Sequence, residues 1–186
     1  MRNNIIKSAL AQVKRFGFRR FTIDEIASDL GISKKTIYKY FDSKSELISA
    51  AVDSQIESEK RSTIEAMNAN VAWLDKFEKI IFSDNCAEKP QDRLIEELQR
   101  FFPEEWSKVE NMREFKSQQL KKILEEGRRK GDISETVHIE TVVMLLESTI
   151  DKLLDLNFVR QHGLTLQSAI REVKQIILYG ILNGQK

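Results

Sequence analysis

Apolar residues recur along most of the chain with the spacing of an α-helix rather than that of a β-strand. The first stripe covers about residues 3–17, and its members are Ile5, Ile6, Ala9, Leu10, Val13 and Phe16. Residues three and four apart lie on one face of a helix, so this stripe predicts an amphipathic helix that ends at Gly17. No sustained alternation of apolar and polar residues occurs. The pattern therefore predicts an all-α protein.

Two short helices with clear start signals follow the first one. Thr22 is placed to cap a helix that runs to Gly31, and Glu25 stands three positions after it, as in a capping box. Ser33 is placed to cap the next helix after only two intervening residues. Two helices joined by so tight a turn predict a helix-turn-helix.

The predicted helices become longer beyond residue 47. Ser43 and Glu46 mark the start of a fourth helix. Further helices are predicted at about 71–83, 91–102, 104–129, 136–159 and 165–183, with an exposed loop at 83–92. We therefore expect a three-helix N-terminal domain over residues 1–46 and a helical C-terminal domain over residues 47–186.

The third helix has two different faces when it is drawn as a wheel at about 100° per residue. The side expected to pack against the preceding helices holds Ile37, Tyr40 and Phe41. The opposite side holds Lys35 and Lys39, bordered by Thr36 and Tyr38. Lysine, threonine and tyrosine side chains bind phosphates and reach base edges in a major groove. The outward side is therefore a candidate DNA-reading surface.

Charge is distributed unevenly along a chain whose net formal charge is only +1. Residues 1–45 hold ten lysines and arginines against four acidic residues, a net charge of +6, so the remaining residues carry −5. A basic N-terminal region attached to a mildly acidic remainder is expected of a polyanion-binding module. A solvated charged surface can give the same distribution of charge. Together with the helix-turn-helix spacing and the outward lysines, the charge favours DNA binding.

The stretch FTIDEIASDLGISKKTIYKYFDSKSELISA resembles the DNA-binding region of the TetR family. The family pattern runs T-hydrophobic-x-x-I-A-x-x-x-G-V-S-x-x-T-hydrophobic-Y-x-Y/H-F-x-x-K-x-x-L. The matching residues are Thr22, Ile26, Ala27, Gly31, Ser33, Thr36, Tyr38, Tyr40, Phe41, Lys44 and Leu47. Lys35 departs from the pattern, because many members have glycine or another small residue there. The resemblance covers about residues 5–50.

This resemblance implies a homodimeric transcriptional regulator, usually a repressor, with a helical ligand-binding and dimerisation domain after the DNA-binding one. Such a regulator binds a palindromic operator in double-stranded DNA and releases it when a small-molecule effector binds. Carried over by position, the groove residues are Lys34, Lys35, Thr36 and Lys39. The residues expected to hold the DNA backbone are Thr22, Ser33, Tyr38, Tyr40 and Lys44. Because Lys35 is unusual, the base preferences of the family do not transfer.

The last two helices predict how the dimer forms. The final helix carries an apolar stripe of Leu166, Ile170, Val173, Ile177 and Ile181. The helix before it is apolar over most of its circumference, and its predicted interface residues are Ile139, Val143, Leu146, Ile150 and Leu154. Pairing both helices with a symmetry mate would bury this surface in a four-helix interface. Packing within one protomer is the alternative.

Aromatic and other large residues near helix breaks are candidates for an effector pocket. They are Trp73, Phe77, Phe101, Phe102, Trp106, Phe115 and Met144, with Glu147 as a candidate partner for a cationic ligand group. Ordinary core packing is the alternative for each of them. The sequence does not identify the effector.

No pattern of an enzyme or a metal site is present. His138 and His162 lie far apart, and the chain contains no HExxH, phosphate-binding glycine loop or nucleophile elbow. We therefore expect no enzymatic activity, metal or cofactor. A low-specificity nucleoid-type DNA-binding protein without an effector is the alternative function.

Cysteine content and hydropathy indicate the compartment. The single cysteine, Cys86, excludes an internal disulfide framework and fits a reducing environment. The longest aliphatic run is far too short to cross a bilayer, and the N-terminus has no signal-peptide pattern. We expect a cytoplasmic protein with no membrane partner.

Overall fold

The computed structural model describes residues 1–81 and 92–181, which form ten α-helices and no strand. The helices are α1 (Arg2–Phe16), α2 (Ile23–Leu30), α3 (Lys34–Ile37), α4 (Lys44–Asn68), α5 (Trp73–Ile81), α6 (Asp92–Phe101), α7 (Pro103–Arg129), α8 (Ile139–Leu154), α9 (Leu156–Gln161) and α10 (Leu166–Ile181). The predicted all-α fold is confirmed. Cys86 and residues 83–91 of the predicted loop lie outside the described residues, whereas Asp92, the last residue predicted for that loop, begins α6. Within those residues, no helix is long and apolar enough to span a bilayer.

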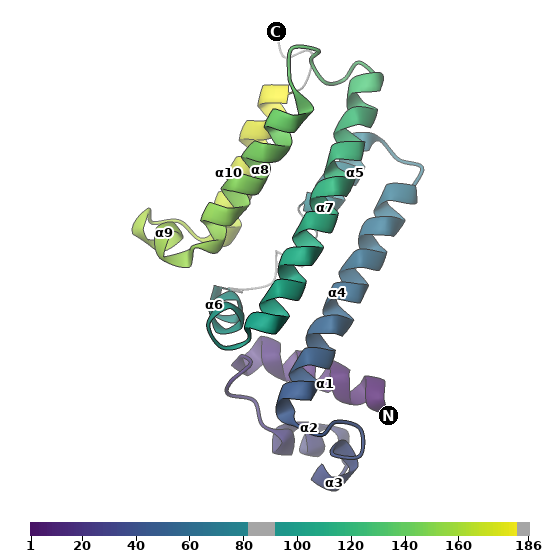
Figure 1. The fold of residues 1–186 in the computed structure, drawn as a ribbon, viewed down its shortest axis with the longest axis vertical. Coiled ribbons are helices and arrows are strands. Elements are labelled where there is room, and N and C mark those ends of the chain that lie inside the picture. The colour runs from purple at the N-terminus through teal and green to yellow at the C-terminus, as the bar shows by residue number, and fades with distance from the viewer. Residues whose placement is uncertain (82–91, 182–186) are drawn as a thin grey trace. The chain divides into compact units, whose positions relative to one another are not determined.

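Packing divides the chain into two compact units, whose helices are labelled in Figure 1. Unit 1 contains α1, α2, α3, α4 up to Lys60, α6, and α7 up to Asn111. Unit 2 contains α4 from Arg61, α5, α7 from Met112, and α8 to α10. These units reflect packing, and the functional boundary between residues 46 and 47 stays a prediction.

The capping residues of the N-terminal helices act as the sequence predicts. The Thr22 hydroxyl accepts a hydrogen bond from the Glu25 N–H at 3.2 Å, and the Glu25 carboxylate accepts from the Thr22 N–H at 2.7 Å. This reciprocal pair confirms the capping box. Gly31 ends α2 in the left-handed conformation, with φ of 62°. Ser33 accepts from the Thr36 N–H at 3.1 Å and caps α3.

Unit 1 has one hydrophobic core that includes the start of α4 and a residue of α6. Its fully buried members include Ile5, Ile26, Ile37, Phe41, Leu47 and Ile48. Leu98 of α6 belongs to the same cluster, and Phe102 and Trp106 pack against it. Burial of these apolar side chains holds α3 in place, because each removes its surface from water.

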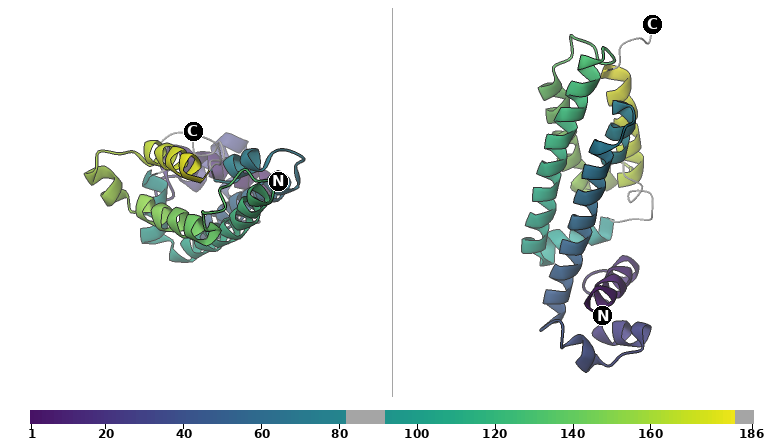
Figure 2. Two further views of the ribbon diagram at one scale, coloured as in Figure 1. Left: turned by 90° about the horizontal axis from the view of Figure 1, so that it is seen from above. Right: turned by 90° about the vertical axis from the view of Figure 1, so that its right-hand side faces the viewer.

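Unit 2 has its own core, built from α4, α5, α7, α8 and α10. In this unit α8 and α10 lie side by side, as the green and yellow helices in Figure 2 show. The helix predicted over 136–159 is wrong in one respect, because α8 ends at Leu154 and α9 begins after Asp155. The Asp155 carboxylate accepts from the Phe158 N–H at 3.2 Å, so it caps a new helix within a continuous apolar pattern.

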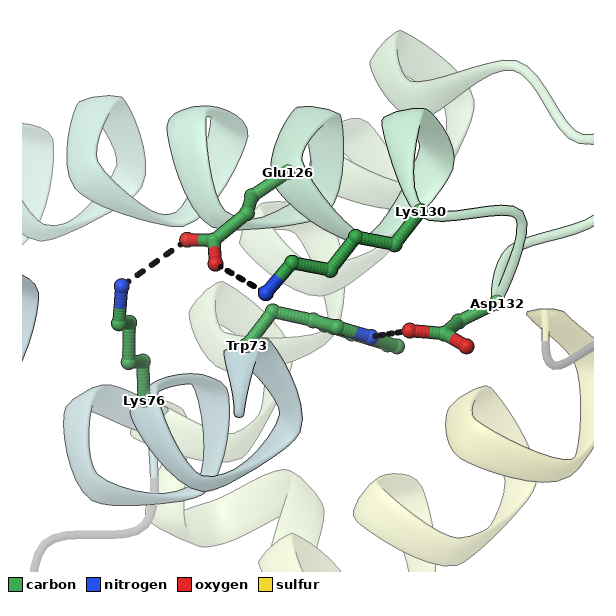
Figure 3. A network of polar contacts seen from close by, with 5 residues as sticks. All are labelled: Trp73, Lys76, Glu126, Lys130 and Asp132. Atoms are coloured by element: carbon green, nitrogen blue, oxygen red, sulfur yellow. Dashed lines mark hydrogen bonds and ion pairs between the residues drawn. The ribbon is translucent and has the colours of Figure 1, made fainter. Parts of the chain in front are cut away.

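A polar network joins α5 to the C-terminal part of α7 (Figure 3). Glu126 on α7 pairs with Lys130 on the same helix at 2.8 Å and with Lys76 on α5 at 3.0 Å. The hydrogen bond from Lys130, followed by that from Lys76, lowers the pKa of Glu126 below its usual value. The carboxylate is therefore held in its charged form while it connects the two helices.

The Trp73 indole packs beside this network. Its Nε1–H donates to the Asp132 carboxylate at 2.7 Å, which joins α5 to the turn that follows α7 (Figure 3). A Cβ atom added at Gly127 would lie 2.7 Å from the indole ring carbons. Glycine at this position therefore lets the indole lie directly against α7, since any larger residue would collide with it.

Candidate nucleic-acid interface

The candidate reading helix is a short α-helix that continues as hydrogen-bonded turns. The Tyr38 N–H donates to the Lys34 carbonyl at 3.0 Å, and the Phe41 N–H donates to the Ile37 carbonyl at 3.2 Å. Ile37 and Phe41 are both buried in the unit 1 core. These two side chains anchor the segment, so its other face is left towards solvent.

The outward face carries the residues that the sequence predicts for DNA contact. Lys34, Lys35 and Lys39 are exposed, and Thr36 is half-buried. Tyr38 is 48% exposed. Tyr40, which the helical wheel places on the packing side, is nevertheless 41% exposed. Both tyrosine rings therefore leave part of their surface available to a partner.

The three lysines of this face differ in their partners. The Lys34 ammonium pairs with the Asp24 carboxylate of α2 at 2.7 Å. Within the described part of the chain, the side chains of Lys35 and Lys39 form no ion pair or hydrogen bond. An exposed ion pair contributes little to stability, so Lys34 can exchange Asp24 for a phosphate at small cost. Sequence reasoning missed Asp24, because no local spacing relates the first turn of α2 to α3.

Thr22 and Ser33 have structural partners at this face. The Thr22 hydroxyl takes part in the capping box with Glu25. The Ser33 hydroxyl caps α3 and lies 3.0 Å from the Thr36 hydroxyl. Both side chains therefore shape the helix starts, and their predicted contacts with the DNA backbone stay predictions.

Lys44 is engaged with the protein backbone. Its ammonium donates to the Arg19 carbonyl at 2.9 Å and to the Phe21 carbonyl at 2.7 Å. Burial lowers the pKa of Lys44 below its usual value, and the carboxylates of Glu25 and Glu97 act in the opposite direction. The sequence shows the charge of Lys44 but gives no sign of these two carbonyls.

Arg2 is a further basic residue of unit 1 that sequence reasoning did not single out. Its guanidinium lies 4.9 Å from the centre of the Phe41 ring. This distance is typical of a cation–π contact. The contact connects the start of α1 to the end of the reading segment, which consists of α3 and the turns after it up to Phe41. In the sequence, Arg2 stands out only because it contributes to the positive net charge of residues 1–45.

Three of the predicted effector-pocket residues belong to unit 1. Phe102 and Trp106 pack against the core of that unit. Phe101 is exposed, and the Arg19 guanidinium lies 4.3 Å from the centre of its ring. These three residues lie at the end of α6, in the break after it and in the first turn of α7.

The other predicted pocket residues belong to unit 2. Trp73 and Phe77 are buried in its core, and Phe115 is half-buried. Met144 is largely exposed, and the exposed Glu147 accepts a hydrogen bond from the Ser117 hydroxyl of α7. The eight predicted residues are therefore divided between two units, and their role as an effector pocket stays a prediction.

The predicted dimer residues are also used in different ways. Ile139, Leu146 and Ile181 are buried in the unit 2 core. Half-buried members are Val143, Ile150, Leu166, Ile170, Val173 and Ile177, and the side chain of Leu154 lies outside the described residues. The large apolar side chains most exposed on α8 and α10 are others, namely Met144, Leu145, Ile176 and Tyr179. Packing within one protomer therefore covers much of the predicted interface. The exposed apolar side chains on the same two helices are ones that the prediction did not include.

Residues 5–51, which contain α1, α2, α3 and the start of α4, match the model of the bacterial regulatory proteins of the tetR family. This region is a DNA-binding region of the TetR family. The N-terminal region of the chain is the helix-turn-helix of a transcriptional regulator, as the motif residues predict.

Other proteins are similar to this one over nearly the whole chain. The uncharacterized HTH-type transcriptional regulator YvaF of Bacillus subtilis is 24% identical over 97% of this chain and 95% of its own. A putative transcriptional regulator from Saccharomonospora viridis in complex with choline has a TM-score of 0.76 at 15% identity, over 98% of both chains. The regulator FadR of Bacillus subtilis in complex with stearoyl-CoA has a TM-score of 0.64 at 20% identity, over 97% of this chain and 100% of that one. Both structures share the fold of this protein.

Proposed function

We propose that this TetR-family regulator is a homodimeric repressor that acts in the cytoplasm, binds a palindromic operator, and releases it when a small-molecule effector binds to unit 2. The exposed basic face of α3 supports the DNA-binding part most directly. The side chains of Lys35 and Lys39 have no ion-pair or hydrogen-bond partner in the described part of the protein. They belong to residues 1–45, whose net charge is +6. Unpaired cations on a helix-turn-helix attract the phosphate backbone and guide the helix into a groove.

The proposed contacts fall into two groups. Lys34, Lys35, Thr36 and Lys39 are assigned to the major groove, where lysine and threonine reach base edges. Thr22, Ser33, Tyr38, Tyr40 and Lys44 are assigned to phosphates, which position the protein on the duplex without reading its sequence. Many family members have glycine or another small residue at the position of Lys35. We therefore expect this protein to prefer a different operator sequence.

Footprinting on the DNA that flanks the gene of this protein tests the proposal. A short footprint with two-fold symmetry is the expected result, since two copies of α3 must lie about one helical turn of DNA apart. Uniform coverage that disappears as the salt concentration rises would instead indicate the nucleoid-type alternative. Transcription from the flanking promoter, measured with and without the protein, then distinguishes a repressor from an activator.

A second copy of the chain is the proposed partner of the exposed apolar surface on α8 and α10. Met144 and Leu145 are 57% and 52% exposed, and Ile176 and Tyr179 are 71% and 63% exposed. Four large apolar side chains on two adjacent helices are therefore exposed, and side chains of this kind are buried in the core of an interface. A palindromic operator also requires a two-fold axis, which a dimer supplies.

We expect Ile176→Glu to dissociate the dimer, because a carboxylate would be buried there without a partner. Gln167→Glu is the matched control, since residue 167 is exposed and lies about 180° from residue 176 around α10. Sedimentation at micromolar concentration should show a monomer for the first variant and a dimer for the second. A wild-type protein that sediments as a monomer would contradict the dimer itself.

The ligands of the structural neighbours supply the first probes for an effector. One neighbour is in complex with choline and the other with stearoyl-CoA. These ligands differ in charge and size, so the proposal for this protein is limited to a small molecule. A ligand that binds only the folded protein at about 100 times its Kd stabilises it by about 2.7 kcal/mol, which thermal unfolding detects. An effector must in addition lower operator affinity, since coupling requires different affinities for two states.

Helix α4 is the proposed element of communication. It is continuous from Lys44 to Asn68, and it belongs to unit 1 as far as Lys60 and to unit 2 beyond. A change of its tilt would alter the spacing of the two reading helices in a dimer. A ligand that binds tightly without changing operator affinity would argue against this mechanism for that ligand.

A further inference from the structure

An exposed ion pair joins the first turns of α2 and α3. The Lys34 ammonium lies 2.7 Å from the Asp24 carboxylate, and the two side chains are 53% and 66% exposed. Asp24 is the second residue of α2, and Lys34 is the first residue of α3. Asp24 therefore brings a negative charge to a candidate DNA-reading face that also carries the exposed Lys35 and Lys39.

The helix-turn-helix has other and stronger sources of stability than this pair. Glu25 forms the capping box of α2 with Thr22, and Ile23 and Ile26 are buried in the unit 1 core. Ile37 anchors α3 in the same core. An ion pair as exposed as this one contributes little to stability, because both groups keep much of their hydration. The fold therefore gives little reason for an acidic residue at this place.

A carboxylate on a DNA-binding face weakens binding to duplexes of any sequence. Attraction to phosphates supplies essentially all of the non-specific affinity of a protein for DNA. Asp24 opposes this attraction by its own charge and by neutralising Lys34. Lys34 can leave Asp24 for a phosphate, but the Asp24 carboxylate then lies without its cation near a polyanion. Asp24 thus disfavours every duplex that does not offer this carboxylate a donor.

The ion pair presents a donor and an acceptor that match one base pair. In the major groove, lysine donates to guanine O6 and N7, and aspartate accepts from cytosine N4. Guanine O6 and cytosine N4 are hydrogen-bonded to each other in a G·C pair, so they lie about 2.9 Å apart. The Lys34 nitrogen and the Asp24 oxygen are separated by a similar distance, 2.7 Å. Each group can therefore bind its own base while the ion pair stays intact.

Both groups have enough hydrogen-bonding positions for such a contact. An ammonium has three N–H groups and a carboxylate has about four lone-pair positions, so the ion pair leaves several of them for bases. The reversed base pair C·G, and likewise A·T, would place an amino donor against Lys34 and a carbonyl acceptor against Asp24. T·A keeps the right polarity, but it places the thymine methyl group where guanine has N7 and adenine N7 close to Asp24. The chemistry of the pair therefore favours G·C, with T·A second.

We propose that Asp24 is a specificity-determining residue, which together with Lys34 reads one G·C base pair in each half-site of the operator and lowers the affinity for duplexes that lack it. The proposal deepens the DNA-binding function proposed above and rests on it. It adds an acidic side chain from α2 to a reading surface that the sequence places on α3. Lys35, Lys39 and the phosphate contacts keep the roles assigned to them.

The experiment uses the full-length protein and the operator that footprinting identifies. A panel of duplexes carries each of the four base pairs in turn at every position of both half-sites, and a random duplex is added. Affinities and melting temperatures are measured for the wild type, Asp24→Ala, Lys34→Met and the double variant. Glu57→Ala is the matched control, because it removes an exposed carboxylate of unit 1 at about 20 Å along α4 from its first residue.

We expect one position in each half-site where the wild type prefers G·C and loses about tenfold or more in affinity for A·T and C·G. Asp24→Ala should lose this preference and bind the random duplex several times more tightly, since a dimer then lacks two carboxylates near phosphates. Lys34→Met should lose the same preference without the gain on the random duplex. The double variant should lose no more of it than either single variant, because both residues read the same base pair. Glu57→Ala should keep the wild-type preference.

Three results would overturn the proposal. Asp24→Ala with the wild-type preference at every position would show that Asp24 reads no base, and a lowered melting temperature in that variant would then assign it to the fold. A preference lost at a position where the wild type selects A·T or T·A would contradict the G·C assignment. An equal loss in Glu57→Ala would show an effect of net charge. A wild-type protein without any sequence preference would instead contradict the proposed function itself.

Discussion

The double variant Lys35→Ala/Lys39→Ala is expected to lose operator binding by roughly a thousandfold at physiological salt, because a dimer would lose four cationic contacts, each contributing about 0.9 to the salt slope. Both side chains are exposed on the reading segment and have no partner in the described residues, so their removal leaves no internal group unsatisfied. The melting temperature should therefore stay close to that of the wild type. Binding isotherms at several salt concentrations, together with a thermal melt, provide the measurement.

Lys7→Ala/Lys14→Ala is the matched control for this prediction. Both lysines are exposed on α1, and the variant loses the same charge from the same unit. We expect a much smaller loss of operator affinity, because these side chains do not lie on the reading face. An equal loss in the two double variants would mean that only the net charge of residues 1–45 matters. The single variant Lys35→Ala should in addition change the preferred base sequence.

Trp73→Ala is expected to destabilise the protein by about 3–5 kcal/mol, which is the usual cost of removing a large aromatic side chain from a core. Trp73 is only 3% exposed, and its indole lies against α7 at Gly127. The variant also removes the hydrogen bond to the Asp132 carboxylate (Figure 3). Chemical denaturation followed by circular dichroism measures the change, and a midpoint near that of the wild type would contradict a core role.

Trp73→Phe separates the two contributions to this effect. Phenylalanine keeps an aromatic ring in the same place but lacks the indole N–H, so the loss should be nearer the cost of one hydrogen bond and a smaller ring. The comparison also bears on the sequence prediction that Trp73 lines an effector pocket. A pocket wall would tolerate Trp73→Ala with little loss of stability and would show the effect in ligand binding instead.

Local signals explain why the N-terminal region follows the sequence so closely. The capping box of Thr22 and Glu25 involves residues three positions apart, and Gly31 satisfies a backbone conformation at the helix end itself. Such features form within one or two turns of the chain, so their spacing is sufficient to predict them. The same reasoning failed at Asp155, because the apolar pattern continues on both sides of that helix break.

Helical periodicity also predicts that a helix has an apolar face. It does not indicate whether that face packs within the protomer or stays exposed. Ile139 and Leu146 are covered by the unit 2 core, whereas Ile176 and Tyr179 on α10 are exposed. All four lie in apolar helices, and their spacing alone does not distinguish the two cases. The described residues of the predicted interface are therefore buried or half-buried in the protomer, whereas Ile176 and Tyr179, which the prediction did not include, remain available to a second copy.

The sequence by itself determined the all-α fold, the helix-turn-helix with its caps, and the sorting of the reading segment into a buried and a basic face. These properties depend on neighbours within a few positions, which is the range that helical spacing describes. Only the tertiary structure decided that Lys34 pairs with Asp24, that Lys44 binds the carbonyls of a distant turn, and that Trp73 packs on α7. Each of these contacts joins residues from different helices or turns, and the formal charge or apolar character of a side chain does not specify which distant group it meets.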